Sequence, residues 1–72
     1  MNDIQVTSML IERLEHIPTD SIWAHRASGI RGQLLRILEQ MEAGQSVNLQ
    51  TIQHACQSAY FILNNAAREK YR

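Results

Sequence analysis

An apolar heptad stripe over residues 23–41 is the feature that most constrains the fold of this chain. An α-helix has about 3.6 residues per turn, so apolar side chains at alternating spacings of four and three residues lie on one helical face. A half-buried strand would instead need alternation with a period of two residues. The stripe therefore predicts a long amphipathic helix over about residues 20–43. Its members are Trp23, Ala27, Ile30, Leu34, Ile37 and Met41.

The flanking residues supply end signals for this helix. Thr19 or Asp20 is a suitable N-cap, and the carboxylate of Asp20 would meet the positive end of the helix macrodipole. Gly44 stands where a left-handed residue commonly ends a helix. The linker over residues 44–48 is short, and Asn48 is a candidate N-cap for the next helix.

A second stripe with the same spacing predicts a helix over about residues 49–70. Many of its side chains are small, which permits close contact between helices. A link of five residues makes neighbouring helices antiparallel, so these two segments are expected to form a long helical hairpin. The members of this stripe are Leu49, Ile52, Cys56, Ala59, Leu63 and Ala66.

A shorter helix is predicted over about residues 3–16. Asn2 is its candidate N-cap, with Gln5 three residues later, and Leu10 and Leu14 fall on one face. Pro18 ends this helix because the residue before a proline is pushed out of helical geometry. The sequence thus predicts a single all-α domain over residues 1–72, in which the first helix packs across the hairpin.

Two glycines, Gly29 and Gly32, fall inside the predicted second helix, where each costs about 1 kcal/mol relative to alanine. The apolar stripe passes through them without a change of phase, so we expect a continuous helix. They share a row with His25 and Arg36, opposite the stripe. Three explanations stand: the glycines relieve crowding where the first helix or a loop crosses or simply tolerate a local bend, they form a groove for another chain or a ligand, or they break the helix as the turn of a helix-turn-helix.

The aromatic residues divide between core and surface. Trp23 begins the first stripe and is expected to be largely buried, so that its truncation to alanine would cost about 3–5 kcal/mol. Phe61 falls on the polar face of the third helix. It would belong to the core if it lay beside the first helix, and it is otherwise an interface candidate. The interaction candidates are therefore His25, Gly29, Gly32, Arg36 and Phe61.

The chain has 72 residues, and a domain of this size buries only about 60% of the surface that it exposes when unfolded. Cys56 is its only cysteine, which excludes an intrachain disulfide and suits the reducing cytoplasm. Self-association is the remaining means of completing the core. We expect a homodimer that closes a bundle from two hairpins. The residues expected in the core or in the dimer seam are Trp23, Ile30, Leu34, Ile37, Met41, Ile52, Cys56, Ala59 and Leu63.

Charge and motif content narrow the function classes. Seven basic residues balance seven acidic ones, so no bulk charge attracts nucleic acid or an anionic membrane. We see no signal peptide and no apolar run long enough to span a bilayer. No metal-ligand spacing or nucleophile with an orienting carboxylate is present, so we expect neither catalysis nor a metal nor a cofactor.

The favoured function is a non-enzymatic, cytoplasmic protein-protein interaction module, a homodimeric adaptor or regulator that contacts itself and another protein. The alternative is a small nucleic-acid-binding regulator that uses the basic middle of the second helix. Arg26, Arg31 and Arg36 lie there with no acid between Asp20 and Glu39. Successive members of that set point in different directions around the helix, which is also typical of a solvated surface.

Overall fold

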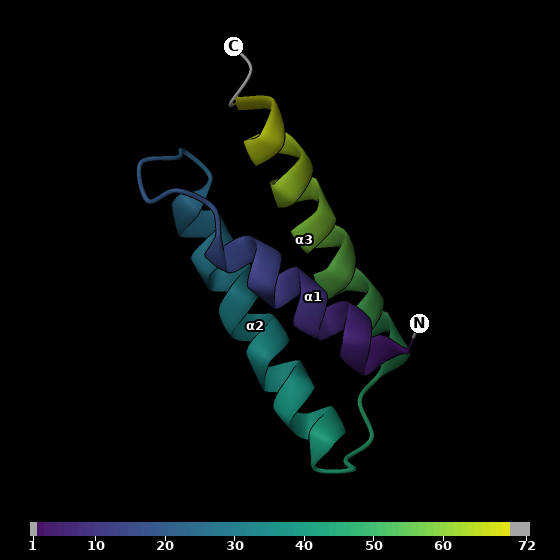
Figure 1. Ribbon diagram of the computed structural model, residues 1–72. Helices are drawn as coiled ribbons and strands as arrows, with labels where there is room; N and C mark the ends of the chain where they lie inside the picture. Colours follow the sequence, from purple (N-terminus) through teal and green to yellow (C-terminus); the bar gives the residue numbers. More distant parts are fainter. Residues whose placement is uncertain (1, 70–72) are drawn as a thin grey trace.

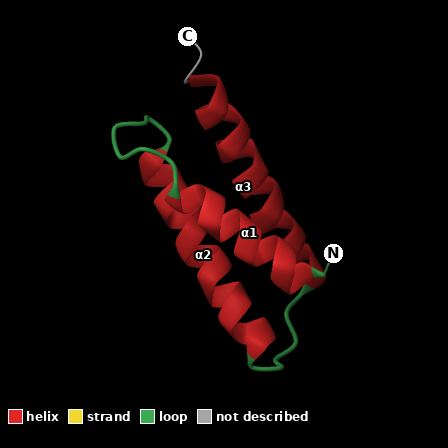
Figure 2. Ribbon diagram, viewed as in Figure 1, coloured by secondary structure: helices red, strands yellow, loops and turns green. Residues whose placement is uncertain are grey.

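The computed structural model describes residues 2–69 and contains three helices within them (Figures 1 and 2). They are α1 (Asp3–Glu15), α2 (Ala24–Glu42) and α3 (Leu49–Glu69). The predicted all-helical, three-helix class is confirmed. Figure 1 shows α2 and α3 running in opposite directions, with α1 lying across the pair and in contact with both. The molecule is elongated, with extents of 42 × 17 × 17 Å.

Local sequence signals explain most of the helix ends. The Asn2 side chain accepts a hydrogen bond of 2.8 Å from the backbone N–H of Gln5 at the start of α1. Asn48 accepts an equivalent bond of 2.8 Å from the N–H of Gln50. Gly44 has a φ of 78°, the left-handed conformation that glycine adopts without a Cβ penalty. Its N–H donates to Met41, and the next N–H donates to Gln40, which satisfies the last carbonyls of α2.

The start of α2 differs from the prediction. The helix begins at Ala24, and neither Thr19 nor Asp20 caps it; Trp23 is the N-cap and makes no capping bond with its side chain. The chain before it folds into turns, in which Ser21 N–H donates to the Pro18 carbonyl at 3.0 Å and Ala24 N–H donates to the Ser21 carbonyl at 3.1 Å. At the other end, α3 is described to Glu69, and residue 70 of the predicted helix lies outside the described residues.

The core lies where all three helices meet. On α3 the buried face consists of Ile52, Ala55, Ala59 and Ile62, whereas Leu49 is 59% exposed. The buried face of α3 is thus rotated around the helix axis relative to the predicted stripe. The reason is that α1 and α2 pack against the two edges of this face, and the most buried positions of α3 lie between these two helices. The buried apolar side chains are Leu10, Ile11, Leu14, Ala27, Leu34, Ile37, Ile52, Ala55, Ala59 and Ile62.

Four residues expected in the core or dimer seam are buried within a single chain, and Ala59 is 0% exposed. They belong to the core because three helices of one chain already cover them. These four residues are Leu34, Ile37, Ile52 and Ala59. Those that are partly buried and pack against this core are Trp23, Ile30, Met41, Cys56 and Leu63.

Candidate interaction groove

A groove with a volume of about 430 Å³ runs between α2 and α3, and its lining comes from these two helices alone. We call it the α2–α3 groove. Apolar and uncharged polar groups form most of its surface, with a single arginine at the end near the start of α2. Its lining residues are Arg26, Gly29, Ile30, Gln33, Ser58, Phe61 and Ile62. Two of the predicted interaction candidates, Gly29 and Phe61, thus lie in one place, whereas His25, Gly32 and Arg36 do not line it.

Phe61 lies beside the start of α2, and its side chain is 57% exposed. Its ring meets the Trp23 indole edge to face, with a centroid distance of 5.8 Å and an interplanar angle of 82°. This T-shaped geometry is favourable for aromatic pairs. The Arg26 guanidinium lies 5.4 Å from the centroid of the same indole, within cation–π range.

Trp23 packs against the core, as its place on the stripe predicts, but it is partly buried and does not belong to the fully buried set. The physical reason is its position before the first turn of α2, at the end of the helix pair rather than within it. There the indole packs on Phe61 on one side and keeps solvent access on another. Ile22, the preceding residue, is 73% exposed. Apolar surface therefore gathers at this end of the groove.

The helix continues through both glycines, as predicted, and the alternative of a break is wrong. A Cβ built at Gly29 or Gly32 would meet nothing within 4 Å, so these positions relieve no crowding among the described residues. Gly29 is exposed and lines the groove, while Gly32 is half-buried outside it. A close approach by another molecule and tolerance of a local bend both stay predictions.

The basic residues of α2 face different neighbours. Arg26 covers Trp23, whereas Arg31 lies toward α1, where its guanidinium is 3.7 Å from the carboxylate of Glu15. His25 and Arg36 are exposed. A pair as exposed as Arg31 and Glu15 contributes little to stability because solvent screens it. The arginines therefore form no single stripe along the helix.

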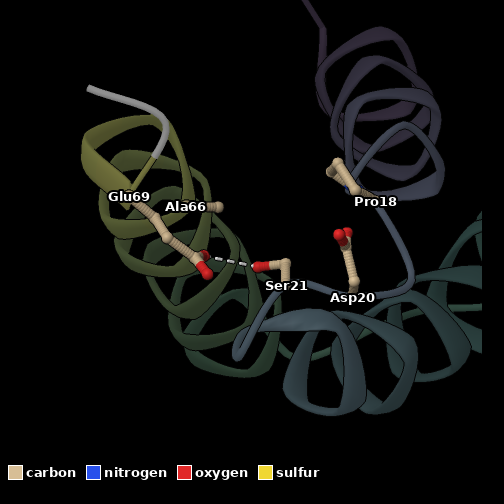
Figure 3. A pocket seen from close by; sticks show the side chains of 5 residues that line it. All are labelled: Pro18, Asp20, Ser21, Ala66 and Glu69. Atoms are coloured by element: carbon tan, nitrogen blue, oxygen red, sulfur yellow. Dashed lines mark hydrogen bonds between the residues drawn. The ribbon is translucent and has the colours of Figure 1, made fainter. Parts of the chain in front are cut away.

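A second set of contacts closes the end of the molecule next to the groove. Figure 3 shows a pocket of about 270 Å³ lined by Pro18, Asp20, Ser21, Ala66 and Glu69. The Ser21 hydroxyl donates a hydrogen bond of 2.6 Å to Glu69 Oε2, and the Ile22 N–H donates one of 3.2 Å to Glu69 Oε1. The Trp23 N–H donates to Ser21 Oγ at 3.1 Å. We call this network the Glu69 clasp.

Sequence reasoning missed the Glu69 clasp. Ser21 and Glu69 are 48 residues apart, and neither belongs to a stripe or a recognisable motif. The available signal was indirect: the first turn of α2 contains no acidic residue. Glu69 instead accepts hydrogen bonds from the turn that precedes α2, at Ser21 and Ile22.

Cys56 is partly buried, as the edge of an apolar stripe would be, and it faces α1. Burial raises the pKa of its thiol, and the nearby Asp3 carboxylate raises it further, while a hydrogen bond with Thr7 acts in the opposite direction. A raised pKa keeps the thiol protonated and unreactive near neutral pH. The sequence predicts Cys56 in the core or the dimer seam, and in the structure it packs against the core.

Comparisons with protein-family models, with curated proteins and with solved structures find no match to this chain. Among residues 2–69, no group of three or more His, Cys, Asp or Glu side chains is placed to hold a metal ion. None of the three described helices is both long and apolar enough to cross a bilayer. The α2–α3 groove and its surroundings are therefore the features of this chain that bear on its function.

Proposed function

We propose that this chain is a non-enzymatic helical interaction module, which forms a homodimer through the α2–α3 groove and acts as an adaptor or regulator. The observation that carries the proposal is the exposure of Phe61, 57% of whose side chain meets solvent at the groove. Aromatic side chains are enriched at interfaces because they bury a large apolar area with little loss of conformational freedom. Trp23 and Arg26 beside it are also residue types that frequently dominate binding energy.

A second copy of the chain is the occupant that the dimensions favour. The long face of the molecule measures 42 × 17 Å, which approaches the roughly 800 Å² that each partner buries in a standard interface. A two-fold axis across this face would bring together two copies of α2 and α3. The antiparallel hairpin of α2 and α3 would then be the body of a four-helix bundle, with α1 on the outside.

Association would also add to the limited stability of so short a chain. A short domain gains stability when exposed apolar side chains on one copy are removed from water by another. Gly29 contributes because it has no side chain, so a partner in the groove can approach the backbone of α2 closely. The single cysteine suits a reducing compartment, and we place the module in the cytoplasm.

The test compares two neighbouring aromatics on α3 by sedimentation equilibrium. Phe61 and Tyr60 are 57% and 51% exposed, but they point about 100° apart around the helix and only Phe61 lines the groove. We expect the wild-type chain to be a dimer at micromolar concentration. Phe61→Ser should raise the dissociation constant about tenfold or more, while Tyr60→Ser should leave it unchanged.

Two results would overturn this proposal. One is a wild-type chain that stays monomeric as its concentration rises, and the other is a Phe61→Ser variant that dimerises as tightly as wild type. A monomer that bound duplex DNA or RNA, with an affinity that falls steeply with salt and is lost in Arg36→Gln, would support the nucleic-acid-binding alternative.

A further inference from the structure

The start of α2 is held by a residue of α3 rather than by a cap of its own. Trp23, the N-cap, makes no capping bond with its side chain, and the first turn of α2 contains no acid. The acceptor near this end is the carboxylate of Glu69, the last described residue of α3. Hydrogen bonds to an ionised carboxylate are about twice as strong as those between neutral groups.

We propose that Glu69 is the positioning residue of the α2–α3 groove: its clasp on residues 21–23 holds the Trp23 indole in its T-shaped contact with Phe61. Each of the three consecutive residues takes part. Ser21 Oγ and Ile22 N–H donate to the two carboxylate oxygens, and Trp23 N–H donates to Ser21 Oγ. The backbone that carries the indole is thereby tied to the helix that carries Phe61.

The clasp sets the shape of the groove at its aromatic end. Phe61 and Glu69 are eight residues apart on α3, or about 12 Å at 1.5 Å per residue. Residues 21–23 span the distance between these two side chains: Ser21 is hydrogen-bonded to Glu69, and the Trp23 ring contacts the Phe61 ring. Release of the first contact would free the turn, and the indole would no longer be held in one orientation. The effect on association rests on the proposed dimer, whereas the effect on Trp23 does not.

Helix electrostatics give a substitution at Glu69 a diagnostic sign. A negative charge at the C-terminal end of a helix opposes the macrodipole, so removal of an idle carboxylate there should leave α3 unchanged or slightly more stable. If the Glu69 clasp holds the chain as proposed, removal of the carboxylate should instead make the protein less stable. Glu42 provides the matched control because it is an exposed glutamate in the last turn of α2.

The experiment uses the full chain, in which Trp23 is the only tryptophan. Glu69→Ala should lower the near-ultraviolet circular dichroism of Trp23 and shift its emission to the red, with the far-ultraviolet helix signal retained. The dimer dissociation constant should rise about tenfold. Ser21→Ala and Glu69→Gln should change the Trp23 signals in the same direction by a smaller amount, and Glu42→Ala should not change them.

The outcomes separate the two proposals. Unchanged Trp23 spectra in Glu69→Ala overturn the positioning role, whatever the association state of the chain. A Trp23 change in Glu69→Ala equal to that in Glu42→Ala also overturns it. A monomeric wild-type chain whose Trp23 spectra respond to Glu69→Ala supports the clasp while it refutes the dimer.

Discussion

Substitution of Gly32 by alanine should make the protein more stable. Gly32 lies inside α2, and a Cβ at this position would meet nothing within 4 Å. The new methyl group therefore creates no clash, and the gain is the difference in helix propensity, about 0.8–1.0 kcal/mol. For a domain of this size, 1 kcal/mol shifts the melting temperature by about 4–8 °C.

The other two glycines provide internal comparisons. Gly29→Ala meets the same open space in the same helix, so it should stabilise the monomer by a similar amount. Gly44→Ala should do the opposite, because φ is 78° there. An L side chain in the left-handed region costs about 1–2 kcal/mol. One chemical change is thus expected to have opposite signs at positions that differ only in backbone conformation.

Thermal unfolding followed by far-ultraviolet circular dichroism, at several protein concentrations, measures these effects. The reasoning fails if Gly32→Ala leaves the melting temperature unchanged or lowers it. A decrease that grows with protein concentration would show that the glycine row itself packs against a second copy. In that case Gly32→Leu should abolish the dimer, and the interface would move from the α2–α3 groove to the outer face of α2.

Three further predictions concern the core. Leu34→Ala should cost about 3–5 kcal/mol because Leu34 is 0% exposed, and a urea midpoint within error of wild type would contradict its central position. Thr7→Val should stabilise the chain by about 1 kcal/mol. The buried Thr7 hydroxyl has no hydrogen-bonding N or O partner in the described part of the chain, and the Cys56 thiol beside it forms only weak hydrogen bonds. A lower melting temperature in the variant would refute this prediction. The rate of Cys56 alkylation should rise with pH, and the midpoint of this rise should lie at a higher pH in the folded chain than in denaturant, because burial raises the pKa of the thiol. The folded state keeps the thiol proton to a higher pH than the unfolded state does. The thiol therefore contributes stability that is lost as the pH rises above its pKa in the unfolded chain. Coincident midpoints would show that the thiol is solvated.

Parts of the fold that depend on near neighbours in sequence were predictable. The Asn2 cap, the left-handed Gly44 and the Asn48 bond each involve residues only a few positions apart, so the local sequence contains all the interacting groups. The continuity of α2 through Gly29 was also predictable, because the stripe keeps its phase on both sides. Periodicity likewise identified the three helices as amphipathic.

Contacts between helices decided what the sequence left open. Periodicity identifies an apolar face but does not say which neighbour packs on each edge, so the turned face of α3, with Ala55 and Ile62 buried, emerged only from three helices packed together. Trp23 matched the stripe but lies just before the first turn of α2, as its N-cap, and it is only partly buried there. The same holds for the Glu69 clasp, whose two sides are 48 residues apart. The sequence determined where helices form because those interactions are local, and the tertiary structure determined the groove because its walls and its clasp come from segments that meet only when the chain folds.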